Sequence, residues 1–219
     1  MNPLRPDPFE RFRHIVVEGP VGAGKTSLAR RLSERFGAQP VLEEPQANPF
    51  LERFLLEGPR HALPAQLFFL FQRAERLRAI AQRDLFDRAV VGDFLLEKDP
   101  LFAALTLADD ELALYRRIYD TLRPQAPTPD LVVYLQAQPD TLVERVRKRG
   151  VPAEASMSEA WLRSIADAYS RFFHGFDAAP LLIVNTERLN PVDRDEDLDL
   201  LVQHALAMRG RREFFNLAR

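Results

Sequence analysis

A glycine-rich stretch near the N-terminus has the residue types and the spacing of a phosphate-binding loop. Gly19 to Thr26 read GPVGAGKT and match the pattern G-x-x-x-x-G-K-[ST] in full. The apolar run HIVVE at residues 14–18 precedes the loop, and the helical pattern LARRL at residues 28–32 follows it. A loop between a strand and a helix N-terminus directs several backbone N–H groups, and the positive end of the helix dipole, at one anion. The stretch therefore predicts a site for the phosphates of a nucleoside triphosphate.

The residues of this loop predict how the nucleotide is held. Lys25 is expected to reach the β- and γ-phosphates, and the Thr26 hydroxyl is expected to sit on Mg²⁺. A dinucleotide-binding fold needs G-x-G-x-x-G, and this loop lacks the third glycine. We expect ATP as the phosphate donor, bound by Gly19, Gly22, Ala23, Gly24, Lys25, Thr26 and Ser27.

The composition argues against several other classes of protein. The 219 residues carry a formal net charge of -2, which gives no basic field for nucleic acid. The chain has no cysteine, so thiolate zinc sites and a cysteine nucleophile are excluded, and its four histidines are scattered. No stretch approaches the length of a membrane span, and the N-terminus lacks the apolar region of a signal peptide. We therefore expect a cytoplasmic enzyme with no nucleic-acid or membrane partner.

Short apolar runs alternate with longer helical patterns along the chain. The runs are rich in β-branched residues, as in strands buried on both faces of a parallel sheet, and lie at 14–18, 40–43, 89–93, 131–135 and 181–185. Helical patterns lie at 25–36, 63–83, 110–122, 139–149, 158–173 and 195–208. The alternation predicts a three-layer α/β fold with five parallel strands in a single domain over residues 1–219.

Acidic residues follow two of the expected strands. Glu43-Glu44-Pro45 ends the second strand, and Asp93 ends the third. Ligands of open α/β sheets bind at the carboxyl ends of the strands, so these side chains are candidates for the acceptor side. Attack of a hydroxyl on a γ-phosphate needs a positioned carboxylate to accept the proton. Alternation along a strand puts Glu43 and Glu44 on opposite sides, so only one of them is expected to do so.

Four segments, in this order, resemble the deoxynucleoside kinases, especially the bacterial deoxyadenosine and deoxyguanosine kinases. They are EPQANPFL at 44–51, QLFFLFQR at 66–73, DFLLEKDPLFA at 93–103 and RVRKRG at 145–150 together with Glu154. The resemblance extends from about residue 14 to about residue 185. It implies a P-loop kinase fold with strand order 2-3-1-4-5, an arginine-rich lid at about residues 145–157, and transfer of the ATP γ-phosphate to the 5'-hydroxyl of a deoxynucleoside.

The resemblance also implies catalytic roles. Glu44 matches the family's catalytic carboxylate, and Pro45 fixes the turn beside it. Asp93 is expected to hold Mg²⁺ through water. Arg145 and Arg149, one helical turn apart, match lid positions that neutralise charge on the transferred phosphoryl group.

The acceptor nucleoside is expected to meet a helix and a loop. Gln66 and Arg73 are seven residues apart and share a helix face, where an amide and a guanidinium can read the edge of a base. By resemblance, Phe102 stacks on the base and Glu154 binds the 3'-hydroxyl. The Gln66 helix is apolar almost all round, which favours burial or packing on a partner, and the family forms dimers through helices. We expect a homodimer.

The sequence departs from the family at three positions. Phe94 stands where the family often has an arginine, Val151 replaces a third lid arginine, and no tyrosine lies near Leu55 for the 3'-hydroxyl. Lys98, one of only three lysines, follows five residues after Asp93. We expect it to stand in for the missing arginine near the 5'-hydroxyl and the γ-phosphate.

Two other functions fit the phosphate-binding loop. A nucleoside monophosphate kinase of the thymidylate-kinase type would need an additional arginine near the third strand, and Phe94 argues against it. A non-catalytic P-loop switch would bind nucleotide to control a partner, and it would give Glu44, Arg145 and Arg149 no reason to converge.

Overall fold

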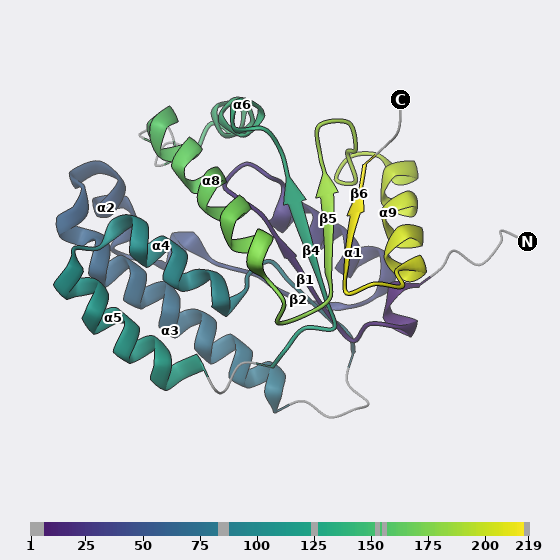
Figure 1. Ribbon diagram of the computed structural model, residues 1–219, viewed down its shortest axis with the longest axis horizontal. Coiled ribbons are helices and arrows are strands. Elements are labelled where there is room, and N and C mark those ends of the chain that lie inside the picture. The colour runs from purple at the N-terminus through teal and green to yellow at the C-terminus, as the bar shows by residue number, and fades with distance from the viewer. Residues whose placement is uncertain (1–6, 83–87, 124–126, 152–153, 155–156, 217–219) are drawn as a thin grey trace, which may run out of the picture.

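The fold is built on a parallel sheet with helices on both faces (Figure 1). The computed structural model describes residues 7–82, 88–123, 127–151, 154 and 157–216. Within them the sheet has six strands in the order β2-β3-β1-β4-β5-β6. The strands are β1 (His14–Glu18), β2 (Gln39–Val41), β3 (Val90–Gly92), β4 (Leu131–Gln136), β5 (Leu181–Asn185) and β6 (Arg212–Phe215). The α/β fold and the strand order 2-3-1-4-5 are thereby confirmed.

The expected number of strands, five, was one too few. The sixth, β6, pairs in parallel with β5 through registers such as Leu182 with Glu213. Its sequence REFF gives no continuous apolar run because this strand lies at the edge of the sheet, and Phe214 is 62% exposed. An edge strand needs burial on fewer sides, so its sequence signal is weak.

Helices connect the strands at nearly the expected positions. The expected helices correspond to α1 (Lys25–Phe36), α3 (Ala62–Ala81), α5 (Asp109–Leu122), α6 (Pro139–Arg149), α8 (Glu159–Gly175) and α9 (Asp195–Ala207). Two short helices had not been expected, α2 (Leu51–Glu57) and α4 (Asp99–Thr106), together with 3-10 turns such as η2 (Pro45–Ala47) and η4 (Leu96–Lys98). None of the helices in the described part of the chain is both long and apolar enough to span a bilayer.

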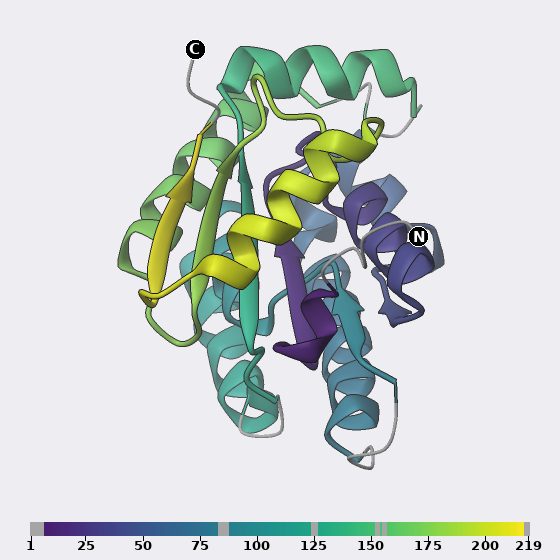
Figure 2. The ribbon, with the colours of Figure 1, turned by 90° about the vertical axis from the view of Figure 1, so that its right-hand side faces the viewer.

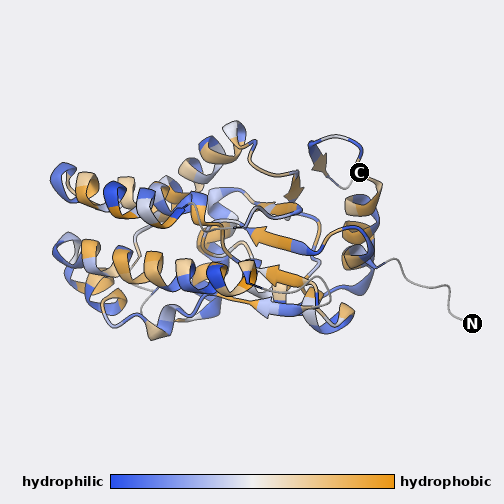
Figure 3. Cartoon of the chain, turned by 90° about the horizontal axis from the view of Figure 1, so that it is seen from below, coloured by the Kyte–Doolittle hydropathy of each residue, from blue (hydrophilic) through white to orange (hydrophobic). Residues whose placement is uncertain are grey.

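Alternate residues of each central strand enter two separate cores. On one face Ile15 and Val17 pack with residues of α1 and α9. Figure 2 shows α9 crossing this face of the sheet. On the other face Val16 packs with residues of α8 such as Tyr169 and Phe173. Figure 3 shows these apolar strands between layers of helices. Burial on both faces explains why the strands read as continuous apolar runs.

A third core joins α3, α4 and α5 beside the β2 edge of the sheet. Leu70 and Leu77 of α3 pack there with Phe94, Ala103 and Tyr115. Phe94, which stands where the family often has an arginine, is therefore a core residue. This core holds α3 and α4 at the carboxyl end of β2 and β3, where the candidate site lies.

Candidate active site

The stretch between β1 and α1 has the backbone of a phosphate-binding loop. Gly22 and Gly24 take φ values of 87° and 91°, which side chains on L-residues rarely adopt. A Cβ on Gly22 would lie 2.8 Å from the carbonyl oxygen of Leu142. Gly19 is constrained by close approach alone, since its Cβ would lie 2.8 Å from the carbonyl oxygen of Leu135. The loop leads into the N-terminus of α1, whose first residues are Lys25, Thr26 and Ser27.

Thr26 of this loop is joined to Asp93 at the end of β3. The Thr26 hydroxyl donates to one carboxylate oxygen of Asp93, and the N–H of Glu43 donates to the other over 2.7 Å. Burial, and then the negative charge of Glu43, raise the pKa of Asp93 above its ordinary value. Burial, and then repulsion by the Lys98 ammonium, lower the pKa of Lys25. A divalent cation and a polyphosphate bound here would oppose these two shifts.

The two oxygens fit a magnesium site that the substrate completes. Mg²⁺ prefers oxygen ligands and is commonly held by one or two protein groups together with substrate phosphates. Thr26 and Asp93 place a hydroxyl and a carboxylate oxygen side by side next to Lys25. Within the residues that the structure describes, no group of three or more acidic, histidine or cysteine side chains could hold a metal by itself.

Glu43, and not Glu44, lies beside these residues. The side chain of Glu43 is 12% exposed, and its carboxylate accepts from Arg73 Nε over 2.6 Å. Burial raises the pKa of Glu43, but the positive charges of Arg73 and Lys98 outweigh it and hold that pKa at about 2. The side chain of Glu44 is 56% exposed and pairs with Arg76 over 2.9 Å.

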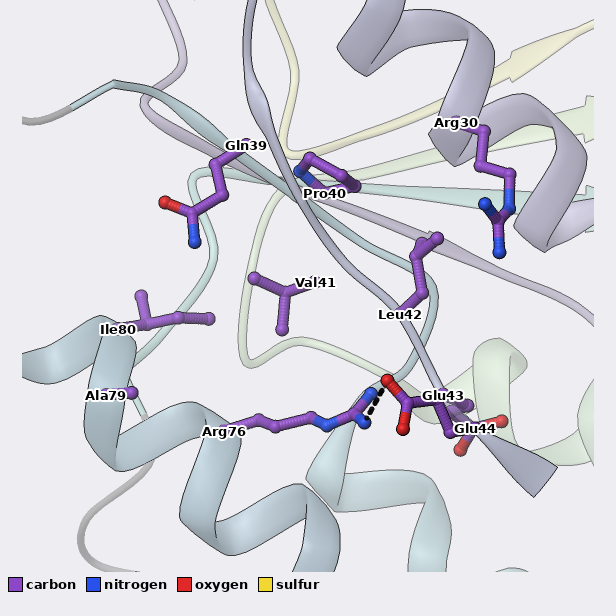
Figure 4. Close-up of a pocket in the computed structure, with 10 residues that line it drawn as sticks. All are labelled: Arg30, Gln39, Pro40, Val41, Leu42, Glu43, Glu44, Arg76, Ala79 and Ile80. Carbon is purple, nitrogen blue, oxygen red and sulfur yellow. Dashed lines mark ion pairs between the residues drawn. The ribbon is translucent and has the colours of Figure 1, made fainter. Parts of the chain in front are cut away.

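The placement of Glu44 differs from the expectation, and the backbone explains the difference. β2 ends at Val41, and successive residues after it still point to alternate sides, so Glu43 turns inward and Glu44 outward. Figure 4 shows the pocket of about 470 Å³ at this outer side, with Glu44 and Arg76 paired and Arg30 across from them. Pro45 begins η2 directly after Glu44 and thereby fixes this turn.

Gln66 and Arg73 lie on α3, on the face that was expected to meet the acceptor. Both side chains are buried, and Arg73 contacts Asp99 of α4 as well as Glu43. The second carboxylate oxygen of Asp99 is buried with no hydrogen-bond partner in the described chain. Asn48 donates to the carbonyl of Ala65 over 3.0 Å and so attaches the segment after β2 to this helix.

Lys98 and Phe102 lie next to each other on the same side. Lys98 is 1% exposed, and its Nζ lies 2.8 Å from Glu18 and 3.7 Å from Glu43. The same ammonium lies 6.0 Å from the centroid of the Phe102 ring, which meets the ring of Tyr169 edge to face at 6.0 Å between centroids. Lys98 therefore forms a buried ion pair and is not a solvated loop residue.

Three buried polar residues of this site had not been expected: Glu18, Asp99 and Tyr169. Glu18 and Asp99 could have been found, because each is an acid at the boundary of an apolar segment and both are completely buried. Tyr169 carries no such signal, since a tyrosine on the apolar face of a helix usually serves packing. Only the fold brings its hydroxyl to Glu18 over 3.1 Å.

The expected lid residues are paired within the chain. Arg145 donates to the hydroxyl and the carbonyl of Thr186 over 3.0 and 2.7 Å. Arg149 pairs with Glu154, so an expected catalytic cation and an expected sugar ligand contact each other here. Residues 152–153 and 155–156 of the expected lid lie outside the described residues.

A second pocket lies on the other side of the phosphate-binding loop. It has a volume of about 390 Å³ and is bounded by Gly22 to Gly24, by Arg145 and Lys148 of α6, and by residues 186–193 after β5. Arg145 therefore lines a cavity that adjoins the loop. This position suits the remainder of a nucleotide whose phosphates lie in the loop.

Comparison with known proteins decides the family. The family model for deoxynucleoside kinase matches residues 15–207. The chain belongs to the deoxynucleoside kinase family.

Relatives of known name agree with this membership. Deoxyguanosine kinase of Bacillus subtilis (strain 168) is 33% identical over 156 residues, which cover 71% of this chain and 75% of that protein. Deoxyadenosine/deoxycytidine kinase of the same organism is 26% identical over 198 residues, covering 86% and 89%. The structure of deoxyadenosine kinase from M. mycoides with products dCMP and a flexible dCDP bound superposes with a TM-score of 0.78 at 22% identity, covering 89% and 100%.

Membership of the deoxynucleoside kinases confirms the expected reaction class. The chain is a phosphotransferase, and phosphorylation of deoxynucleosides is favoured over a monophosphate kinase and over a nucleotide switch. The solved structure supports the fold of this deoxynucleoside kinase.

The backbone of the phosphate-binding loop yields a prediction about nucleotide affinity. Gly22→Ala adds strain of about 1–3 kcal/mol at a positive φ and brings a Cβ against Leu142, so the loop must move. We expect the Kd of ADP, measured by isothermal titration calorimetry, to rise about tenfold or more.

Gly37→Ala is the matched control for Gly22→Ala. Gly37 ends α1 with a φ of 68°, and a Cβ there meets no atom within 4 Å. It should cost stability and leave the Kd of ADP unchanged. Wild-type affinity in the Gly22→Ala protein would show that the loop tolerates a side chain and does not hold the phosphates as described.

Proposed function

We propose that this deoxynucleoside kinase transfers the γ-phosphate of ATP to the 5'-hydroxyl of a deoxynucleoside, with Mg²⁺ as cofactor. The observation that carries the proposal is the meeting of Lys25, the Thr26–Asp93 pair and the Glu43 carboxylate at the carboxyl ends of β1, β2 and β3. Groups that can bind phosphate and Mg²⁺ thereby lie beside a carboxylate that can accept the proton of a hydroxyl. Phosphoryl transfer needs little beyond such positioning and charge stabilisation.

Glu43 is our candidate for the group that receives the proton of the acceptor. Because its pKa is about 2, the carboxylate is ionised at neutral pH and can accept a hydrogen bond from the 5'-hydroxyl. So weak a base accepts the proton only after the 5'-oxygen has begun to bond to the γ-phosphorus, because that bond makes the 5'-hydroxyl more acidic. Arg73 holds the carboxylate on its other side and so fixes its direction.

The donor is proposed to lie between the loop and the lid. Lys25 and the backbone of residues 19–27 would hold its phosphates, and Thr26 with Asp93 would hold Mg²⁺, which offsets charge on the β- and γ-phosphates when bound. The cavity beside Arg145 would take the rest of the nucleotide. Arg149 and Glu154 would exchange their mutual ion pair for contacts with the phosphates and the sugar.

The acceptor is proposed to lie between α3 and α4. Gln66 and Arg73 provide hydrogen-bonding groups for the nucleoside, and Phe102 provides an aromatic face. The carboxylate oxygen of Asp99 that has no partner in the described chain can accept a hydrogen bond from it. Lys98 would lie next to the 5'-oxygen. A cytoplasmic location also stays part of the proposal.

The choice of acceptor is the direct test of the proposed function. With labelled ATP and Mg²⁺, we expect label to pass to at least one of the four common deoxynucleosides and to none of their monophosphates. Phe94 lies in a core and offers no cation for an acceptor phosphate. Lys25→Met is the control and should abolish transfer, since it removes the phosphate-binding ammonium. Label on monophosphates alone would overturn the proposal.

The two adjacent glutamates are expected to differ in their effect on catalysis. Glu43→Gln should lower kcat about 100-fold or more, the usual scale for a lost general base, with the KM for ATP nearly unchanged. Glu44→Gln is the matched control and should lower kcat by less than about threefold, because Glu44 is exposed and makes a surface ion pair. Steady-state kinetics of both variants decide; the opposite order of effects would assign the proton acceptor to Glu44.

A homodimer through α3 and α5 is proposed from the exposed apolar residues of these helices. Phe71 on α3 is 53% exposed and Leu114 on α5 is 48% exposed, although both helices already pack on a shared core. A second copy of the chain would cover these faces.

The variant Phe71→Glu should therefore change the mass in solution, measured by light scattering, from two chains to one. Leu56→Glu on α2 is the control, because Leu56 is exposed outside this surface, and it should leave two chains. A wild-type protein with the mass of one chain would exclude the dimer.

A further inference from the structure

Both oxygens of the Glu18 carboxylate contact polar groups of the site, although no catalytic role was expected for this residue. Glu18 ends β1 and is completely buried. One of its oxygens accepts from the N–H of Gly19 over 2.9 Å and from the hydroxyl of Tyr169 over 3.1 Å. The other accepts from the N–H of Leu95 over 2.9 Å and lies 2.8 Å from Nζ of Lys98.

These four contacts leave Glu18 without a role as a proton acceptor. A carboxylate has about four lone-pair sites, and all are directed at donors from the phosphate-binding loop, the segment after β3, η4 and α8. Glu18 therefore differs from Glu43, whose carboxylate borders the space proposed for the acceptor. Among the ion pairs of the described residues, Glu18 pairs with Lys98, and its charge also acts on Lys25.

Lys98 lies between a fixed carboxylate and the proposed proton acceptor. An ammonium has three donors; one meets Glu18, and Glu43 lies within 3.7 Å. Burying such a pair is costly, and an apolar pair of the same volume would often be as stable, so stability alone gives little reason for this charge. An ammonium at this place can donate to an oxygen that gains negative charge during phosphoryl transfer.

We propose that Glu18 is a positioning residue for phosphoryl transfer, which acts by holding the Lys98 ammonium beside the 5'-oxygen of the acceptor. This inference rests on the proposed function and adds a residue to it. In the step, the bond from the 5'-oxygen to the γ-phosphorus forms and the bond from that phosphorus to the β–γ bridging oxygen breaks, so ADP leaves with the electron pair. The proton of the 5'-hydroxyl passes to Glu43, and Lys98 keeps its protons throughout.

A purely structural Glu18 would act differently. Its hydrogen bonds to Gly19 and Leu95 hold backbone of the phosphate-binding loop and of the segment after β3. Loss of that support would weaken ATP binding and stability whether or not Lys98 is present. A positioning role through Lys98 instead vanishes once the ammonium is gone, and a double-mutant cycle separates the two.

The experiment measures kcat and the KM for ATP in Lys98→Met, Glu18→Gln and the double variant. Lys98→Met should lower kcat about 100-fold, the scale for one lost donor to developing charge, with the KM for ATP changed by less than about threefold. Glu18→Gln should lower kcat about tenfold or more, and the double variant should be no slower than Lys98→Met alone. Losses that multiply, or a wild-type kcat in Lys98→Met, would overturn the inference.

A milder variant keeps the test decisive if Glu18→Gln does not fold. Tyr169→Phe removes one donor from Glu18 and should lower kcat a few-fold in the wild-type background and not at all in Lys98→Met. Tyr115→Phe is the matched control, since it removes a buried hydroxyl that has no partner in the described chain, and should leave kcat unchanged. Equal effects of Tyr169→Phe in both backgrounds would contradict the inference. No turnover of any deoxynucleoside by the wild-type enzyme would instead refute the proposed function.

Discussion

Charged side chains are buried at the carboxyl end of the sheet, and the elements around them must be placed so that each charge meets an opposite one. Four carboxylates, Glu18, Glu43, Asp93 and Asp99, meet three cations, Lys25, Arg73 and Lys98, in a region with little access to water. Removing one partner of a buried pair typically costs about 3–5 kcal/mol, because the other charge is left uncompensated. The strands bring most of the acids, and α3, η4 and the phosphate-binding loop must bring the cations to them. In the proposed function, substrate phosphates and Mg²⁺ would bind among charges that the fold has already placed.

The expected lid has charged residues that are exposed to water, unlike those buried at the carboxyl end of the sheet. Arg149 and Glu154 form an ion pair whose arginine is about half exposed, and such pairs contribute about 0–1 kcal/mol. A triphosphate can therefore draw Arg149 away at small cost. The proposed acceptor residues of α3 and α4 are held by buried contacts and Arg149 of the expected lid by an exposed one, so we expect binding of ATP to rearrange α6 and its surroundings more than α3 and α4.

The sequence predicted what depends on local pattern. Strands buried on both faces read as apolar runs, so the five expected strands were located correctly. The glycine-rich loop lies between β1 and α1, as its fixed order of glycines and lysine predicted. The strand β6 was not predicted, because an edge strand such as REFF needs no continuous apolar run. The placement of Glu43 rather than Glu44 beside Asp93 depends on where β2 ends and how Pro45 begins η2, and alternation alone could not say which carboxylate turns inward. The contact between Glu18 and Tyr169 joins residues 151 positions apart and exists only through the packing of α8 on the sheet.

We propose that Glu43, together with a Lys98 ammonium held on Glu18, places the acceptor hydroxyl. A crystal structure with a deoxynucleoside and a non-hydrolysable ATP analogue tests it most directly. We expect the 5'-oxygen within hydrogen-bond distance of both the Glu43 carboxylate and Lys98 Nζ, with Glu44 still paired with Arg76. A 5'-oxygen bound to Glu44, with Lys98 turned away from the acceptor, would contradict it.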